Sequence, residues 1–416
     1  SVADVLKRCG FVGELKGMGG ALCYLYGDYG VEARRAPWFL HALVATHYIG
    51  GAFFPTGGSA SIAKTLVAAI TRRGGHVFVR APVSEIVVEG GRAVGVVCRG
   101  VRMRAAVAVI SAAGFRNTFG AADKDAKGTR ALLADEVAAP TRALLQQSHA
   151  AVDAAKSPAS YKPLTSAGTT WRFPIDSKEP VPDRVGGSIA MVYLFVGLDA
   201  SDDTLGIQAR NVWALSDYDA DAAFSRFDQL DLSDEQGGCP TMPAMEELPA
   251  IFIGSASAKD SNWAQRHPGK AAMTVLCPVK AEWFERWEGT KIKNRGEEYK
   301  AYKVQWKALL LEALYAHWPQ TRGHVAYADV ATPLSNDFYL ASTKGEVYGL
   351  EHTTARFDSL DAMLALHPQT AVPGLFLTGQ DTVGVGIATA LCSGVLTASR
   401  ISYRATMRCV LDMMIA

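Results

Sequence analysis

Residues 373–393 read PGLFLTGQDTVGVGIATALCS, and this stretch decides the fold. Three apolar residues at 375–377 lie between turn-forming residues, a pattern that predicts a short buried strand. Gly379, Gly384 and Gly386 follow, and residues 387–396 predict a helix. A strand that leads into a helix through glycines leaves the first helical amides available to an anion or a cofactor. We therefore expect a ligand site at this turn.

The glycine pattern alone leaves two interpretations open. Residues 384–389, GVGIAT, resemble a degenerate dinucleotide fingerprint in which Thr389 replaces the third glycine. An ordinary strand, turn and helix fits the same letters. Gln380 and Asp381 favour a functional site, because they follow the strand at the edge where open α/β sheets bind ligands.

Composition limits the class of protein. A chain of 416 residues with 49% hydrophobic and 20% charged residues predicts a globular protein of two domains. The net charge of +1 predicts no nucleic-acid partner. No apolar run approaches the roughly 20 residues that span a bilayer, which leaves peripheral membrane contact open.

Cysteine and histidine spacing argues against a metal site. The seven cysteines form no C-x-x-C pair, and the nine histidines form no H-E-x-x-H motif. This arrangement predicts neither a disulfide framework nor a zinc site. Free thiols are typical of a reducing compartment or an organelle interior.

The chain divides into three segments by its pattern. Strands are predicted at 76–80, 83–89, 93–98 and 102–110, with a hairpin turn at Gly90 and Gly91. Further strands are predicted at 189–198, 211–215, 250–254 and 273–278, a helix at 301–316, and an irregular segment at 329–371. We interpret residues 121–364 as a domain inserted between two pieces of a cofactor domain, 1–120 and 365–416. The fold class is α/β with an α+β insert that contains a mixed sheet.

The sequence motifs favour cofactor-dependent chemistry over hydrolysis. Hydrolytic and phosphate-binding motifs such as G-x-S-x-G and the P-loop are absent from the sequence. Aromatic residues accompany the glycine turns: Trp38, Tyr48, Phe53, Phe54, Tyr339 and Tyr348. Such residues suit redox chemistry on an apolar substrate, although aromatic residues also fill ordinary cores.

Several segments together resemble one family. They are HYIGGAFFPTGGSASIA, RRGGHVFVRAPVSEIVVEGGRAVGV, DSNWAQRHPGKAAMTVLCPVKAEWFERW, TPLSNDFYLASTKGEVYG and PGLFLTGQDTVGVGIATAL. In this order they are similar to all-trans-retinol 13,14-reductase (retinol saturase) proteins, within the carotenoid isomerase and phytoene desaturase group of FAD-dependent oxidoreductases. LTGQD favours the retinol saturase branch over the prolycopene isomerases. The resemblance implies an FAD-binding Rossmann-like domain of the amine-oxidase type and a lipophilic polyene substrate, reduced or isomerised at one double bond.

The resemblance also implies residue roles. Asp381 would contact the ribityl and pyrophosphate region of FAD, and the Gly386 and Ile387 amides would lie near the flavin. Val83 would hold the adenine edge through its backbone. The other residues implied are Gly57, Gly58 and Gly379 for the cofactor and Tyr48, Phe53, Phe54, Tyr339 and Tyr348 for the substrate. It identifies no catalytic acid or base in this chain.

One departure from the family leaves alternatives open. Such proteins open with a strand, G-x-G-x-x-G and a helix, and only Gly17, Gly19 and Gly20 come near that pattern here. The sequence could be truncated, its partner half could be a separate polypeptide, or the protein could have lost FAD and become a non-catalytic, pigment-associated subunit of a larger complex. Each alternative predicts a partner that covers exposed apolar surface. The resemblance implies a plastid or endoplasmic reticulum location without a transmembrane helix.

Overall fold

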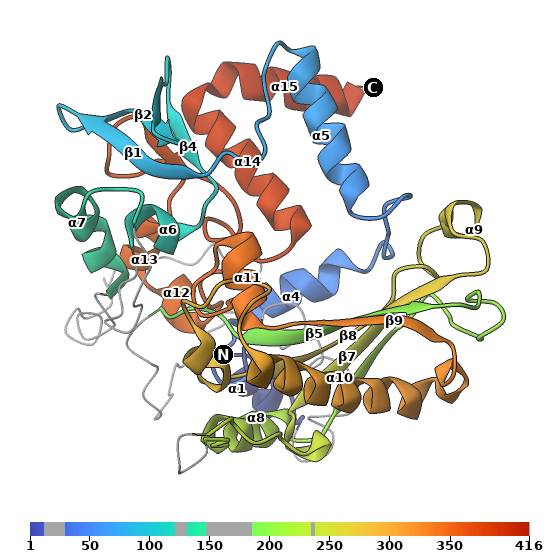
Figure 1. Cartoon of the computed structure of the whole chain (residues 1–416). Coiled ribbons are helices and arrows are strands. Elements are labelled where there is room, and N and C mark those ends of the chain that lie inside the picture. The colour runs from blue at the N-terminus through green and yellow to red at the C-terminus, as the bar shows by residue number, and fades with distance from the viewer. Residues whose placement is uncertain (12–29, 121–130, 147–184, 234–237, 416) are drawn as a thin grey trace, which may run out of the picture. The chain divides into compact units, whose positions relative to one another are not determined.

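The computed structural model describes residues 1–11, 30–120, 131–146, 185–233 and 238–415 (Figure 1). Packing groups the chain into two units. Unit 1 comprises Ser1–Ser84, Val97–Met103 and Gly187–Glu351, and unit 2 comprises Glu85–Val96, Arg104–Gly186 and His352–Ala416. The predicted domain boundaries at residues 120 and 364 stay a prediction.

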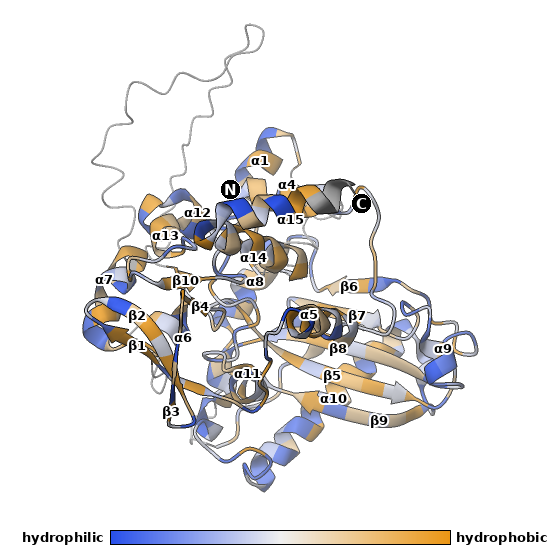
Figure 2. Cartoon of the chain, turned by 90° about the horizontal axis from the view of Figure 1, so that it is seen from above, coloured by the Kyte–Doolittle hydropathy of each residue, from blue (hydrophilic) through white to orange (hydrophobic). Residues whose placement is uncertain are grey.

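Unit 1 contains a five-stranded sheet in the order β6-β7-β8-β5-β9. Its strands are β5 (Ala190–Leu198), β6 (Asn211–Leu215), β7 (Ala250–Ser255), β8 (Ala271–Val279) and β9 (Val325–Ala331). All four pairings are antiparallel, where a mixed sheet was expected. An antiparallel sheet can leave one face in water, and in β5 the side chain of Leu194 is fully buried whereas that of Phe195 is 45% exposed. Hydrophobic colouring runs along β5 in Figure 2.

The buried face of this sheet packs against α10 (Glu297–His317), which lies along the strands in Figure 1. Tyr302, Trp306, Leu310 and Leu314 recur every four residues, and each is fully inaccessible to solvent. Burial of one such side chain contributes about 1.5–3 kcal/mol. These aromatics belong to the core.

Unit 1 also contains several shorter helical elements. They are α1 (Val2–Arg8), α4 (Trp38–His47), α5 (Ala60–Arg72), α8 (Ala220–Gln229), η2 (Met245–Glu247), α9 (Trp263–Arg266), η3 (Ala281–Trp287), η4 (Pro319–Thr321) and α11 (Pro333–Leu340). Trp283 and Phe284 of η3 continue the aromatic core of α10, with ring centroids 6.3 Å from that of Trp306.

Unit 2 is built on two parallel strands, β4 (Val109–Ser111) and β10 (Leu375–Leu377). Its helices are α6 (Phe115–Phe119), α7 (Asp135–Gln146), α12 (Thr354–Asp358), α13 (Leu360–Ala365), α14 (Ile387–Ile401) and α15 (Tyr403–Ile415). A three-stranded sheet, β1 (Val83–Glu89), β2 (Arg92–Cys98) and β3 (Val101–Arg104), has the order β1-β2-β3, and of its residues only 85–96 and Arg104 belong to unit 2.

The structure confirms the α/β class and most predicted elements, and it corrects three. The predicted strand 102–110 is broken between β3 and β4. Residues 76–80 form no strand, and Phe78 and Val79 are 68% and 82% exposed, because these residues pair with no strand that the structure describes. Residues 329–371 are not irregular, since they contain residues 329–331 of β9 and all of α11, α12 and α13.

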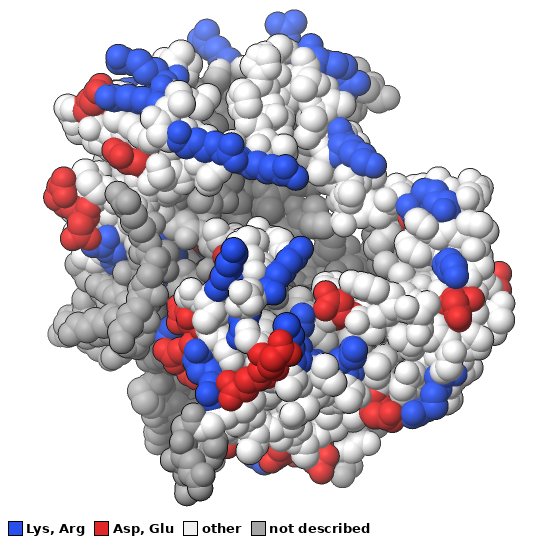
Figure 3. Space-filling view, viewed as in Figure 1, with Lys and Arg blue, Asp and Glu red and all other residues white. Residues whose placement is uncertain are grey.

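The surface carries no dominant sign of charge on the face shown in Figure 3, where acidic and basic side chains are interspersed. Among the described residues, every helix is too short or too polar to cross a membrane.

Candidate cofactor site

The candidate site lies in unit 2, where β4 and β10 end together. Leu375 pairs with Val109 and Leu377 with Ser111, so the loops that follow both strands begin at one edge. Gly374, just before β10, lies close to β2, because a Cβ at this position would be 2.7 Å from the Ala93 carbonyl oxygen. The predicted strand is therefore confirmed, with its carboxyl end leading into the glycine turn.

Two hydroxyl groups attach α14 to this strand. Ser393 is fully buried, and its Oγ accepts a hydrogen bond of 2.6 Å from the Gly379 amide. The hydroxyl of Thr397, 1% exposed, donates to the Leu377 carbonyl oxygen at 2.7 Å. Ser393 and Thr397 therefore lie on the buried face of α14, and their hydrogen bonds fix the backbone at Leu377 and Gly379, where the glycine turn begins.

Asp381 is buried within the same turn, with 5% of its surface exposed. Its Oδ2 accepts a hydrogen bond of 2.7 Å from the Phe115 amide at the start of α6. The carboxylate therefore links the loop after β10 to the loop after β4. Contact of Asp381 with FAD stays a prediction, and the structure gives the residue a structural role as well.

Gly386 begins α14 with φ +96°, in the left-handed region that favours glycine. No side chain of the described residues caps this helix, whose first amides have no partner within the helix. The hydroxyl of Thr389 instead donates to backbone carbonyls, among them that of Gly384 at 2.7 Å. The helix N-terminus therefore presents free amides and a positive dipole end.

The buried side chain of Arg356 binds the backbone of the turn. Its guanidinium, 2% exposed, donates from Nη2 to the carbonyl oxygens of Gln380 and Asp381 at 2.9 and 2.7 Å. Its Nη1 lies 3.2 Å from Nε2 of His352, which is fully buried. Burial, together with the Arg356 cation, lowers the pKa of His352 well below its usual range, so the imidazole is neutral.

The predicted residues of unit 1 form a second group. Gly57 and Gly58 both have positive φ, and the Gly57 amide donates to Oδ1 of Asp260 at 3.0 Å. This bond holds the pKa of Asp260 below its ordinary value. Asp260 also pairs with Arg266. The loop between β7 and β8 thereby fixes the turn that carries Phe53 and Phe54.

The predicted aromatic residues differ in exposure. Phe53 is 92% exposed, Tyr339 is 65% exposed and Tyr48 is 42% exposed, so they are surface rather than core residues. Tyr348 is half-buried, and its amide donates to the Ser188 hydroxyl at 2.8 Å. Val83 opens β1. Their roles toward cofactor and substrate stay predictions.

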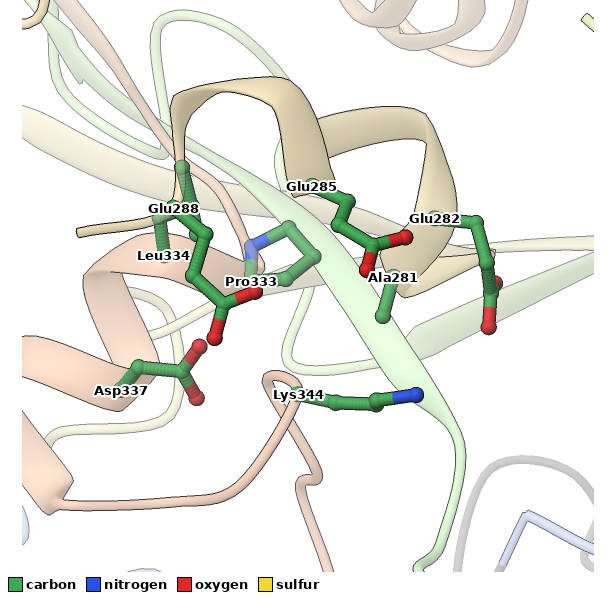
Figure 4. Close-up of a pocket in the computed structure, with 8 residues that line it drawn as sticks. All are labelled: Ala281, Glu282, Glu285, Glu288, Pro333, Leu334, Asp337 and Lys344. Carbon is green, nitrogen blue, oxygen red and sulfur yellow. The ribbon is translucent and has the colours of Figure 1, made fainter. Parts of the chain in front are cut away.

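A shallow pocket in unit 1 carries carboxylates (Figure 4). Glu288, which follows η3, and Asp337 of α11 point toward one another there, and Lys344 lies near them. Burial raises the pKa of Asp337, and the Glu288 charge adds to this, whereas the Gly345 amide donates to Asp337 at 2.7 Å and opposes it. Among the described residues, His, Cys, Asp and Glu form no group that could hold a metal ion.

Comparison with known proteins identifies the class. Residues 17–118 match the family of flavin containing amine oxidoreductases. The crystal structure of an oxidoreductase from Methanosarcina mazei superposes with a TM-score of 0.50 and 15% identity, covering 94% of this chain and 65% of that one. At this identity the likeness shows the fold alone. The fold therefore resembles that of this oxidoreductase, and residues 17–118 match the flavin-containing family.

Sequence relatives narrow the class further. All-trans-retinol 13,14-reductase of Danio rerio is 33% identical over 402 residues, and the Rattus norvegicus protein of that name is 32% identical over 409. The two alignments cover 95% and 97% of this chain and 56% and 58% of those proteins. A Danio rerio protein named inactive all-trans-retinol 13,14-reductase is 26% identical over 380 residues, or 90% of this chain and 53% of that protein. Over nearly its whole length the chain is similar to these all-trans-retinol 13,14-reductases, and it spans a little over half of their length.

FAD is the cofactor that this family implies, and the turn fits its polar groups. The amides at the start of α14 are uncapped, and Gly379 has open space where a Cβ would stand. Gly379 and the backbone around Gly386 and Ile387 would hold the cofactor in unit 2. Sequence reasoning missed Arg356, His352, Ser393 and Asp260, because each acts through contacts to residues distant in sequence.

Proposed function

We propose that this chain is part of an FAD-dependent oxidoreductase that reduces or isomerises one double bond of a retinoid-like or carotenoid-like polyene. The observation that carries the proposal is the 33% identity to all-trans-retinol 13,14-reductase over 95% of the chain. The uncapped helix start at Gly386 supports it, because a flavin presents polar groups that amides can bind.

The chain's own residues would position and shield the reacting groups. When bound, FAD would supply two-electron chemistry, a hydride for reduction or a redox-neutral route for isomerisation. The turn at Gly379 and the start of α14 would bind the cofactor, and exposed aromatics such as Phe53 would contact an apolar substrate.

The test is turnover under anaerobic conditions with all-trans-retinol and dithionite as reductant. Reduction adds a hydride and a proton, so the product should carry two more hydrogen atoms than the substrate. Isomerisation gives a product of unchanged mass and a shifted retention time. Protein that retains flavin but yields neither product would contradict the proposal.

A non-catalytic, pigment-associated subunit is the second candidate. The relative named inactive supports it, although its 26% identity is lower than that of the relatives named as reductases. A polyene that co-purifies unchanged, without flavin, would favour this candidate.

We also propose that a partner protein covers apolar surface on unit 2. α14 buries Ser393 and exposes Ile387, Leu391 and Val395, which share one face of the helix at four-residue spacing. β4 pairs only with β10 among the described strands, and its Ile110 is 51% exposed. Chemical cross-linking in material from the natural source should capture a neighbour at α14, and unmodified monomer alone would oppose the idea.

Finally, we propose peripheral contact with an organelle membrane, of a plastid or the endoplasmic reticulum. Residues 33–84 contain no Asp or Glu but six Lys and Arg residues, and their Ile49 and Phe53 are 82% and 92% exposed. Basic and apolar groups together favour an anionic lipid surface. Co-flotation with phosphatidylserine vesicles, lost with neutral vesicles, would support this contact, and equal recovery without lipid would exclude it.

A further inference from the structure

Arg356 is a buried cation that donates hydrogen bonds to backbone carbonyls of the candidate cofactor turn. Arginine is seldom fully buried, and here 2% of its surface is exposed. Its Nη2 donates to two successive carbonyl oxygens, those of Gln380 and Asp381. A guanidinium has a rigid fork of donors, which a lysine ammonium cannot reproduce.

These bonds determine where the amides of the turn point. A trans peptide is planar, so its N–H points opposite to its C=O. Fixing the Gln380 carbonyl therefore directs the Asp381 amide away from Arg356. Fixing the Asp381 carbonyl directs the Thr382 amide, which donates to the Gly379 carbonyl oxygen at 3.2 Å.

His352 holds the guanidinium in place. A guanidinium can only donate, so Nε2 of His352, 3.2 Å from Nη1, must be the acceptor, and the ring proton belongs to Nδ1. This Nδ1 is buried without a hydrogen-bond partner among the described atoms. A buried donor without a partner costs free energy, and the contact of His352 with Arg356 is made in spite of that cost.

We infer that Arg356, held by His352, is a positioning residue that fixes the turn from Gly379 to Thr382 in the orientation that binds the cofactor. This inference rests on the proposed function for the identity of the cofactor. The orientation of the turn itself can be measured without any flavin.

The first experiment follows hydrogen exchange by mass spectrometry in the flavin-free full chain. Arg356→Met and Arg356→Lys are compared with Arg400→Lys, a change at an exposed arginine of α14 in the same unit. Both Arg356 variants should exchange the amides of residues 378–382 about tenfold faster, and Arg400→Lys should match the wild type. If the Met variant fails to fold, the Lys variant still provides the test, because it retains the buried positive charge.

Exchange within about twofold of the wild type in the Arg356 variants would overturn the inference. Equal acceleration of peptides throughout unit 2 would also overturn the inference, because Arg356 would then stabilise the whole unit rather than the turn. Peptides of β5 in unit 1 should remain unchanged.

The second experiment titrates FAD and records the flavin spectrum. Arg356→Lys should bind FAD about tenfold more weakly than Arg400→Lys, at a temperature where both are folded. Equal FAD affinity in the two variants would overturn the cofactor part of the inference. A wild-type chain that binds no FAD would count against the proposed function, while the exchange data would still decide whether Arg356 fixes the turn.

Discussion

Asp381 gives the sharpest test of how the candidate cofactor turn is built. Its carboxylate is 5% exposed and accepts the Phe115 amide at 2.7 Å, so Asp381→Ala leaves a buried N–H without its acceptor. A hydrogen bond to a charged group contributes about 1.5–3 kcal/mol. At about 1.4 kcal/mol per tenfold change, local opening should become roughly tenfold to a hundredfold more frequent.

The assay is hydrogen exchange of the peptides that contain residues 112–120 and 378–386. Both should exchange faster together in Asp381→Ala, because the Asp381 carboxylate of one loop accepts the Phe115 amide of the other. Glu136→Gln, at an exposed acid of α7 in the same unit, serves as the matched control and should leave both peptides unchanged. Acceleration of only one loop, or of neither, would refute the reasoning. If Asp381 also contacts FAD, the variant retains less flavin.

Three further changes test single contacts. Burial lowers the pKa of His352, so below about pH 6.5 the unfolded chain binds more protons than the folded chain. The contribution of His352 to the free energy of unfolding is therefore full above about pH 6.5 and falls by up to ~1.4 kcal/mol per pH unit below it. In His352→Gln the melting temperature should change less between pH 7 and 5, and an unchanged difference would contradict this. Gly386→Ala should lower the free energy of unfolding by about 1–3 kcal/mol, because Gly386 has a positive φ. Gly394→Ala, within the same helix, should raise it by about 0.5–1 kcal/mol. Equal effects of the two variants on the melting temperature would contradict the argument from backbone strain. Asp260→Ala should speed amide exchange at Gly57, and an unchanged rate there would show that the bond between them does not order the turn.

The strand, glycine turn and helix at 373–396 could be predicted because their signals are local. An apolar triplet between turn residues specified β10, and α14 followed the glycines as expected, although it extends to Ile401. The hairpin of β1 and β2 was predicted for the same reason, since Gly90 and Gly91 lie between two apolar segments.

Elements that depend on distant partners escaped prediction. The apolar residues at 76–80 carry a strand pattern, but a strand requires hydrogen bonds from a neighbour that the described residues do not supply. Residues 333–340 contain Asn, Asp and Ser, which weaken a helix signal, yet Pro333 at the first position and packing of α11 against β5 and β9 stabilise a helix there.

The cofactor role of the predicted site stays a prediction, and the structure adds contacts that the sequence did not reveal. Asp381 was selected because it follows a strand, and its bond to Phe115 spans 266 residues of sequence. Arg356 and His352 lie in HTTARF, which has no motif of its own. Only the folded chain shows that this segment reaches the turn.

The central claim is that the chain belongs to a flavin-dependent oxidoreductase, and the visible spectrum of protein purified from its natural source tests it most directly. The spectrum is recorded before and after denaturation. Release of flavin in an amount close to that of the chain, with its two-banded yellow spectrum, is the predicted result. Absence of flavin, or a spectrum of carried pigment alone, would contradict the claim and favour the non-catalytic subunit.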